Sequence, residues 1–277
     1  MMTRMNLNTF ARHNVFKDKK VAKMVADRLR NREEIEKARA FPYQLFVAWR
    51  EVNTNADVPS DVKEALQDAM EIAIDNVPEI KGNVHVCVDT SGSMGSPVTG
   101  NRGSASSSVS CVEVAGLIAS SIVRKNKSAT VWTFNNDAVK VALNPRDTVI
   151  TNTQKLAKAG GGTNISAPLR KMNAESVKAD VVIYASDNES WIDSGSGYSY
   201  HGTGMMDEWK KFKARNPHAK LICCDLTPRN NSQAKQNKDV LQVGGWSDTV
   251  FSVMESFVDH GFETDHWVEE IEKVDLD

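Results

Sequence analysis

The chain is poor in cysteine and has no long apolar stretch. Among its four cysteines there is no C-x2-C pair, so neither a disulfide framework nor a zinc site is expected, and Cys87, Cys111, Cys223 and Cys224 are predicted to be buried thiols. No apolar run approaches the roughly 18 residues that cross a bilayer, and the first residues, MMTRMNLNTFARH, lack the apolar segment of a signal peptide. These absences predict a cytoplasmic protein without a membrane partner.

Familiar catalytic and nucleotide-binding motifs are also missing. The sequence contains no G-x4-G-K-[ST] phosphate loop and no H-E-x-x-H pair, and its six histidines are scattered. His85 falls inside a predicted strand, where a hydrogen-bonded core histidine is the expected role. A P-loop nucleotidase and a zinc hydrolase are therefore disfavoured, and we expect the protein not to be an enzyme.

What remains is the composition of an ordinary globular protein whose charge is unevenly distributed. The 277 residues are 40% hydrophobic and 25% charged, which excludes collagen-like and largely disordered chains. Residues 1–50 carry 12 Lys and Arg against 5 Asp and Glu, a net charge of +7, whereas residues 51–277 carry 22 against 31, a net −9. This asymmetry indicates two regions.

The hydrophobic pattern changes near residue 80. Apolar residues recur at helical spacing between residues 21 and 77, which predicts three or four helices that are too short to form a core alone. Beyond this point strands are predicted at residues 84–89, 129–134, 180–186 and 220–226, and helices at 109–125, 148–159, 167–173, 205–215 and 248–259. This alternation predicts an α/β fold with a Rossmann-like, doubly wound, mostly parallel sheet, preceded by a small helical segment.

The strongest chemical signal lies at the end of the first predicted strand. Asp89, Ser91 and Ser93 place one carboxylate and two hydroxyls at alternate positions of a turning backbone, which suits a hard divalent cation. Thr163 follows three glycines and Asp187 directly follows another strand, and ligands in such folds gather at the carboxyl ends of strands. We therefore predict that these five side chains hold Mg²⁺, or another divalent cation such as Mn²⁺ or Ca²⁺. Because only two of them are carboxylates, the ion would accept a further carboxylate or phosphate oxygen from a partner.

Other interpretations of the same residues stay open. Residues 89–93 are also compatible with a plain strand-to-turn transition, and the glycines before Thr163 with a hinge or a phosphate cradle. Asp89 could act as a nucleophile toward phosphate, with the metal held by Asp187. That reaction also needs an acid/base partner and a charge-stabilising lysine, and the sequence pattern identifies neither. The metal site is the interpretation that uses all three segments together.

Several longer segments resemble a known family. The segments VCVDTSGSMGSPVTGNRGSAS, AGGGTNISAPL, SDNESW and LQVGGWSDTVF are similar to the C-terminal half of the Ro autoantigen (TROVE) family, particularly its bacterial members. The segments RHNVF, EKARAFPYQLFVAW and DVKEALQDAMEIA resemble the last helices of that family's α-helical repeat ring. The resemblance implies a von Willebrand factor A domain at residues 81–277, after a helical segment at residues 1–80. It also implies that the five oxygen-bearing residues form a metal-ion-dependent adhesion site.

The resemblance further implies a role in a Ro-like ribonucleoprotein, because the family binds small structured RNAs on its helical ring. Most of that ring has no counterpart in this sequence. The candidate RNA contacts, which could equally form a solvated helix face, are Lys17, Lys19, Lys20, Arg28, Arg30 and Arg32. We therefore expect a non-enzymatic, metal-dependent binding module that grips an acidic group of a protein partner or an RNA phosphate. The alternative is a metal-dependent protein-interaction or structural module that does not bind RNA.

Overall fold

Within the part of the chain that the structure describes, the fold centres on a six-stranded sheet. The computed structural model describes residues 3–100, 108–187, 203–228, 236–247 and 249–272. The strands are β1 (Val84–Asp89), β2 (Thr130–Phe134), β3 (Ala138–Val141), β4 (Val181–Ser186), β5 (Lys220–Asp225) and β6 (Val240–Gly244). They lie in the order β3-β2-β1-β4-β5-β6, with β3 antiparallel to β2 and the other neighbours parallel. This arrangement confirms the predicted mostly parallel α/β sheet.

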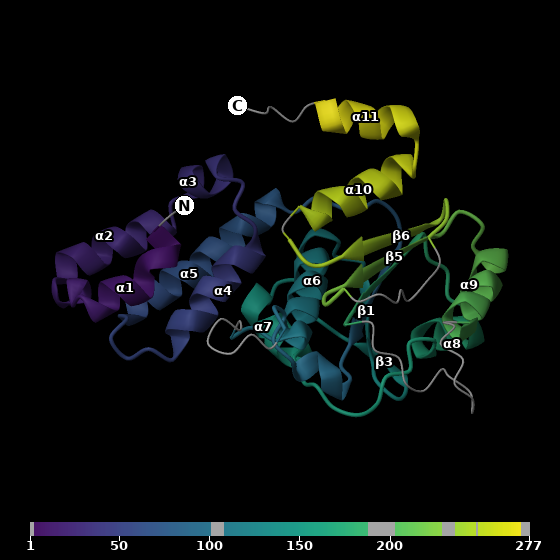
Figure 1. The fold of residues 1–277 in the computed structure, drawn as a ribbon, viewed down its shortest axis with the longest axis horizontal. Helices are drawn as coiled ribbons and strands as arrows, with labels where there is room; N and C mark the ends of the chain where they lie inside the picture. The colour runs from purple at the N-terminus through teal and green to yellow at the C-terminus, as the bar shows by residue number, and fades with distance from the viewer. Residues whose placement is uncertain (1–2, 101–107, 188–202, 229–235, 248, 273–277) are drawn as a thin grey trace.

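Helices cover both faces of the sheet (Figure 1). One face packs against α6 (Cys111–Lys125), α7 (Val149–Leu156) and α10 (Val250–His260), and the other against α8 (Ala167–Ala174) and α9 (Thr203–Arg215). Successive strand side chains alternate between the two faces, so that Val86 and Val88 join the first hydrophobic cluster and Cys87 joins the second. Because both faces are buried, the strands appear in the sequence as nearly continuous apolar runs.

The order of the strands places a topological switch point between β1 and β4. From β1 the chain proceeds to β2 and β3 on one side, and it then returns to β4, β5 and β6 on the other side. Ligands of open α/β sheets bind beyond the carboxyl ends of the strands at such a switch point. Asp89 ends β1 and Asp187 follows β4, so the two predicted acidic ligands lie at this position.

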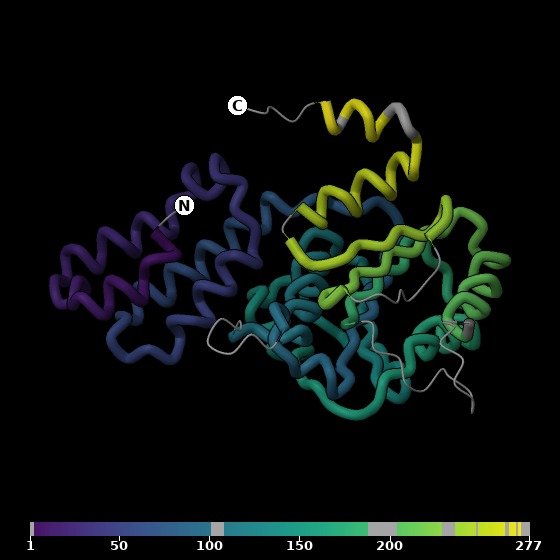
Figure 2. The backbone as a smooth tube through the Cα atoms, in the orientation of Figure 1, coloured from purple at the N-terminus to yellow at the C-terminus, as the bar shows by residue number. Residues whose placement is uncertain are grey.

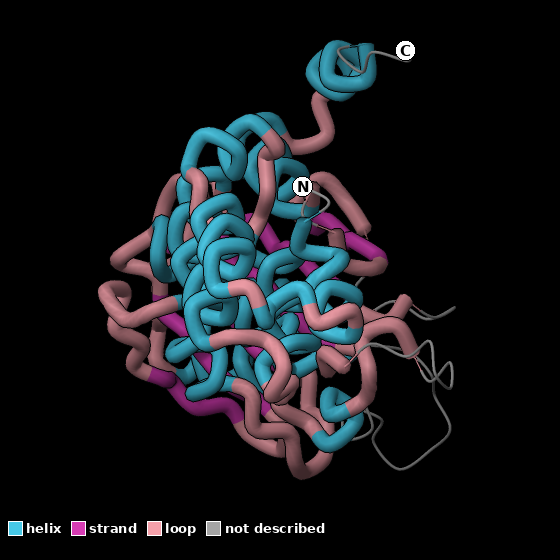
Figure 3. The backbone as a smooth tube through the Cα atoms, turned by 90° about the vertical axis from the view of Figure 1, so that its left-hand side faces the viewer, coloured by secondary structure: helices cyan, strands magenta, loops and turns pink. Residues whose placement is uncertain are grey.

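Before the sheet, the chain forms a segment of short helices. They are α1 (Leu7–Arg12), α2 (Lys19–Leu29), α3 (Arg32–Lys37), α4 (Pro42–Asn53) and α5 (Ser60–Ala73), with single 3-10 turns at Thr3–Asn6, Val15–Lys17, Ile74–Asn76 and, after β1, Gly92–Gly95. Figure 2 shows this segment in purple and blue beside the sheet, and Figure 3 shows it from its outer side. Leu45, Leu66 and Met70 are fully buried in the same hydrophobic cluster as α6 and α10. The helices therefore share a core with one face of the sheet.

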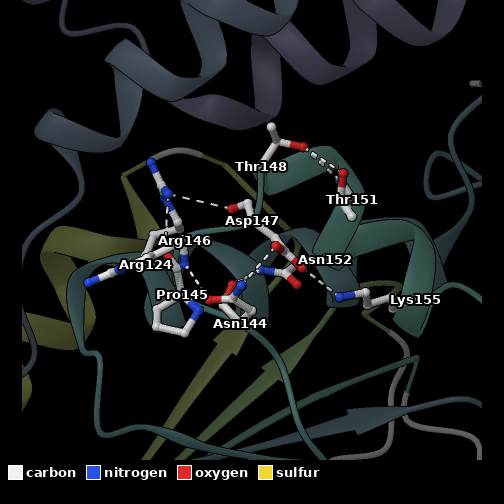
Figure 4. A network of polar contacts seen from close by, with 9 residues as sticks. All are labelled: Arg124, Asn144, Pro145, Arg146, Asp147, Thr148, Thr151, Asn152 and Lys155. Carbon is white, nitrogen blue, oxygen red and sulfur yellow. Dashed lines mark hydrogen bonds and ion pairs between the residues drawn. The ribbon is translucent and has the colours of Figure 1, made fainter.

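Polar contacts also fasten the helical segment to the sheet-bearing part. Arg124 at the end of α6 donates from Nη1 to the carbonyl oxygen of Pro145 at 3.0 Å, within the network around the loop that leads from β3 to α7 (Figure 4). Glu71 of α5 pairs with Arg124 at 2.7 Å and accepts a hydrogen bond from the backbone nitrogen of Val149 at 2.7 Å. One carboxylate thus joins α5 to α6 and to the first residue of α7.

The first turn of α6 carries a second connection. The Oε2 atom of Glu113 accepts hydrogen bonds from the backbone nitrogen and the hydroxyl of Ser110, each at 2.9 Å, which caps the helix at this residue. The Oε1 atom of the same carboxylate accepts from Arg50 Nε of α4 at 2.9 Å. Helix α6 consequently begins at Cys111, two residues later than the hydrophobic pattern predicts.

Four helices and strands were not expected from the hydrophobic pattern: α1, β3, β6 and α11 (Thr264–Glu272). The missed strand β3 is only four residues long and lies at the sheet edge, where Val139 is 59% exposed. Its apolar pattern is therefore too short to stand out. In the described ranges, no helix has the length and apolar character needed to cross a membrane.

Candidate metal centre

The first part of the candidate centre is the turn that follows β1. Asp89 is fully buried, and its Oδ1 atom accepts a hydrogen bond from the backbone nitrogen of Ser91 at 2.8 Å. This contact bends the chain back over the carboxylate, as short polar side chains do in turns. The hydroxyls of Ser91 and Ser93 then lie 3.2 Å apart. One carboxylate and two hydroxyls are thus gathered on the same turn.

The second part comes from the end of β4. The parallel register pairs Val88 with Ala185, so that Ser186 lies opposite Asp89. The Ser186 hydroxyl donates to Asp89 Oδ2 at 2.6 Å, and Asp187 is the next residue along the chain. Asp187 is 3% exposed. Its side chain and that of Asp89 lie close enough for their charges to repel.

The third part is the glycine-rich loop between α7 and α8. The backbone nitrogen of Gly160 donates to the carbonyl oxygen of Thr90 at 2.8 Å, and the nitrogen of Gly92 donates to the carbonyl oxygen of Gly161 at 3.0 Å. These two bonds lay the loop directly against the turn after β1. Thr163, two residues farther along, is 2% exposed. The structure therefore brings all three predicted stretches together at one edge of the sheet.

The backbone conformation at position 161 favours glycine. Gly161 has a φ of +84°, which side chains with a Cβ adopt only with strain, and a Cβ would lie 3.2 Å from the side-chain nitrogen of Asn135. Asn135 in turn donates from that nitrogen to the carbonyl oxygen of Gly160 at 3.1 Å. The loop that carries Thr163 is therefore held in place by its backbone.

The electrostatics of the centre favour a cation. Burial raises the pKa of Asp89 to about 6; hydrogen bonds from Ser186 and Ser91 lower it, and the nearby charge of Asp187 raises it. Burial, followed by the charges of Asp187 and Asp89, raises the pKa of Cys111 to about 12, so this thiol stays protonated. Two adjacent buried carboxylates are costly unless a positive charge compensates them. A divalent ion beside them would supply that charge.

The donor set fits a hard ion of the magnesium type. It consists of two carboxylates and three hydroxyls, which are oxygen ligands of the kind that Mg²⁺ and Ca²⁺ prefer. In the described residues, no group of three or more His, Cys, Asp or Glu side chains is arranged to hold a metal. The candidate centre would thus combine low ligand charge with neutral hydroxyl oxygens. Such an ion keeps coordination positions for water or for an oxygen from a partner.

A cavity of about 520 Å³ opens beside these residues. Ser93 and Asp187 contribute to its lining, together with Tyr43 of α4 and Trp246, which follows β6. The sequence did not single out Ser186 or Tyr43. Ser186 could have been proposed from the sequence, because it directly precedes Asp187 at the end of a predicted strand. Tyr43 gave no signal, since its place depends on how the helical segment packs.

The basic residues predicted to contact RNA fall into two groups along the chain. Lys17, Lys19 and Lys20 are exposed near the start of α2, whereas the three arginines lie at or beyond its end, about 15 Å farther along an 11-residue helix. Those arginines are already engaged by carboxylates, in the pairs Arg28–Glu34 at 3.2 Å, Arg30–Asp68 at 3.3 Å and Arg32–Asp75 at 2.6 Å. The lysine group is consequently the better candidate for an RNA contact.

Comparisons with known proteins agree with this architecture. A family model described as the Ro60 vWA domain matches residues 83–258. The RNA-binding protein RO60 of Deinococcus radiodurans is 28% identical over 209 residues, which make up 71% of this chain and 35% of the relative. The crystal structure of the RO (RSR) protein of the same organism aligns with a TM-score of 0.73 and 21% identity, over 92% of this chain and 52% of that one. The chain thus spans about a third to a half of the length of these proteins.

Proposed function

Because the chain belongs to the Ro60 vWA domain family, we propose that it is the divalent-metal-dependent binding module of a Ro-like RNA-binding system. The observation that carries this proposal is the meeting of the Asp89 turn, the Thr163 loop and Asp187 at the switch point of the sheet. Asp89 and Asp187 would supply the negative charge around the ion. Ser91, Ser93 and Thr163 would supply neutral oxygens.

The bound ion would act as a Lewis acid that holds one further anionic oxygen, provided by a partner. The side chains and backbone of the protein would position the ligands of the ion. Ser186 and the backbone nitrogen of Ser91 orient the Asp89 carboxylate by their hydrogen bonds, and the glycine loop brings Thr163 to the same place. The proposed role is binding without chemical turnover. Turnover of phosphate esters that disappears in Asp89→Asn would contradict it.

Calorimetry with Mg²⁺ tests the metal site directly. Asp89→Asn keeps the shape of the side chain and removes its charge, so Mg²⁺ binding should be lost. Asp207→Asn is the matched control, because this aspartate is exposed on α9 and belongs to none of the three stretches that form the site. At a Mg²⁺ concentration about 100-fold above Kd, the wild type and the control should gain about 2.7 kcal/mol of unfolding free energy. Equal Mg²⁺ binding by the wild type and Asp89→Asn would refute the proposal.

RNA binding is the second half of the proposed function, and it is supported by the naming of the Deinococcus relative as an RNA-binding protein. We infer that the exposed lysines near the start of α2 contribute to it. For a single-stranded RNA probe, replacing Lys17, Lys19 and Lys20 by glutamine should reduce the slope of log K against log salt by about 2. The control carries the same substitution at three exposed lysines of the sheet-bearing part, Lys127, Lys171 and Lys210. Identical slopes for both triple variants would exclude the α2 lysines as the contact.

A further inference from the structure

The cavity beside the candidate metal centre has a wall made of aromatic rings. Tyr43 and Trp246 meet edge to face with their centroids 6.5 Å apart, and Trp246 meets Phe251 of α10 in the same way at 5.2 Å. Phe41 stacks on Phe251 with the ring centroids 6.2 Å apart. Edge-to-face and stacked rings hold one another in defined orientations. The Trp246 ring is therefore supported by its neighbours, and it borders the cavity as a fixed surface.

This wall is built from both parts of the molecule. Tyr43 belongs to α4, whereas Trp246 follows the last strand of the sheet, and Val98 and Leu226 extend the apolar lining from two further loops. Arg50 on α4 pairs with Glu113 at the start of α6. This pair holds α4 against the beginning of the helix that follows the turn after β1. The helical segment thus shapes the space in front of the metal-site residues.

The volume of the cavity exceeds what one acidic group requires. About 520 Å³ lies within the range of roughly 300 to 1,000 Å³ in which proteins hold organic ligands of drug size. A carboxylate that binds a divalent ion beside Ser93 and Asp187 would occupy only part of this volume. The space toward Tyr43 and Trp246 would then receive the group next to that carboxylate, and apolar rings favour an apolar group there.

The charges favour a protein segment over RNA as the occupant. The cavity has a carboxylate, Asp187, in its lining, and residues 51–277 carry a net charge of −9. A polyanion gains affinity from lysine and arginine, whereas acidic surroundings repel it. A peptide with one carboxylate and a neighbouring apolar side chain brings a single negative charge to the ion and apolar surface to the rings.

We propose that this cavity recognises an acidic residue next to a bulky apolar residue in a protein partner, with Tyr43 and Trp246 as the specificity-determining side chains. The inference rests on the proposed metal-dependent function and names the class of partner that the same site would take. The ion at the metal site would bind the carboxylate, and the two rings would contact the adjacent apolar side chain.

The test compares three small probes at saturating Mg²⁺: N-acetyl-Glu-Phe amide, N-acetyl-Glu-Ala amide and adenosine 5′-monophosphate. Calorimetry on the full chain should show that the phenylalanine peptide binds about tenfold more tightly than the alanine peptide, because a further aromatic side chain is buried. The indole fluorescence should change with the phenylalanine peptide. Equal binding of the two peptides would overturn the inference, and so would tighter binding of the nucleotide, which would assign the cavity to nucleic acid.

Variants then attribute the preference to the rings. Trp246→Ala and Tyr43→Ala should bring the ratio between the two peptides close to one, while Mg²⁺ binding itself stays at the wild-type level, which also shows that the variants are folded. Trp246→Phe should restore most of the ratio. Phe262→Ala is the control, since this exposed ring lies beyond α10 and does not line the cavity. An unchanged ratio in both cavity variants would refute the role of the rings.

The outcomes separate this inference from the function on which it depends. If Asp89→Asn binds both peptides as the wild type does, the metal-dependent site itself fails. If peptide binding depends on Mg²⁺ and on Asp89 but ignores the phenylalanine, the proposed function stands and only the subsite fails. The two results differ in the same calorimetric experiment.

Discussion

Acid should destabilise the protein through one buried histidine. His85 lies on β1 with 4% of its surface exposed, and its Nδ1 atom accepts a hydrogen bond from Trp132 Nε1 at 3.0 Å. Burial, and to a smaller extent the charge of Lys140, lower the pKa of His85 from 6.5 to about 4. Protonation of Nδ1 would also remove the acceptor that Trp132 needs.

The sign and size of the effect follow from this difference in pKa. Well above pH 6.5 the imidazole is neutral in both the folded and the unfolded chain, so it contributes no pH dependence. As the pH falls from about 6.5 to about 4, the unfolded chain binds a proton at His85 and the folded chain does not, which favours unfolding. The loss should reach about 3 kcal/mol at pH 4 and should level off only below that pH.

Urea unfolding at a series of pH values measures this loss. His85→Asn is the reference, because an asparagine oxygen can stand where Nδ1 accepts the Trp132 bond and does not titrate. Other groups that titrate in this window, including Asp89, contribute to both proteins and cancel in the difference. The unfolding free energy of the wild type should therefore fall more steeply than that of His85→Asn between pH 6.5 and pH 4.5. Parallel profiles would refute the assignment of a low pKa to this residue.

Two further predictions concern the frame of the candidate site, and both are measured by urea unfolding. Gly161→Ala should lower the free energy of unfolding by about 1 to 2 kcal/mol, because the φ of +84° and the nearby Asn135 side chain oppose a Cβ. The added Cβ of Gly160→Ala meets open space, so this control variant should stay within about 0.5 kcal/mol of the wild type. Equal losses in the two variants would contradict this explanation. Glu71→Gln should lose about 1 to 3 kcal/mol, since the carboxylate joins Arg124 to the backbone of α7. A double-mutant cycle with Arg124→Met should give a coupling energy of at least about 0.5 kcal/mol, and a value near zero would show that the pair contributes nothing.

The sheet could be predicted from the sequence because its central strands are buried on both faces. β1, β4 and β5 appear as nearly unbroken apolar runs, and their predicted bounds differ from the observed ones by a single residue at most. The edge strands β3 and β6 are only four and five residues long, and each is partly exposed, so their patterns do not rise above those of loops. The length and burial of a strand decided whether it could be found.

Part of the candidate site could also be predicted from the sequence, and part of it could not. Asp89, Ser91, Ser93, Thr163 and Asp187 could be proposed from sequence, because each ends or follows a strand or a glycine run, and strand ends gather at one edge of a sheet. Their coordination of a metal stays a prediction. The aromatic wall could not be foreseen, since it depends on the docking of α4 beside the end of β6. Packing between distant segments leaves no local pattern in the chain.

The hydrogen bond between Ser186 and Asp89 spans 97 positions of the sequence. Closing so long a loop has a larger entropic cost, and proteins rich in contacts between distant residues fold more slowly. During synthesis, therefore, the turn after β1 would emerge from the ribosome long before its partner on β4 exists. Capture of an ion at this edge would then mark a molecule whose central strands have already found one another.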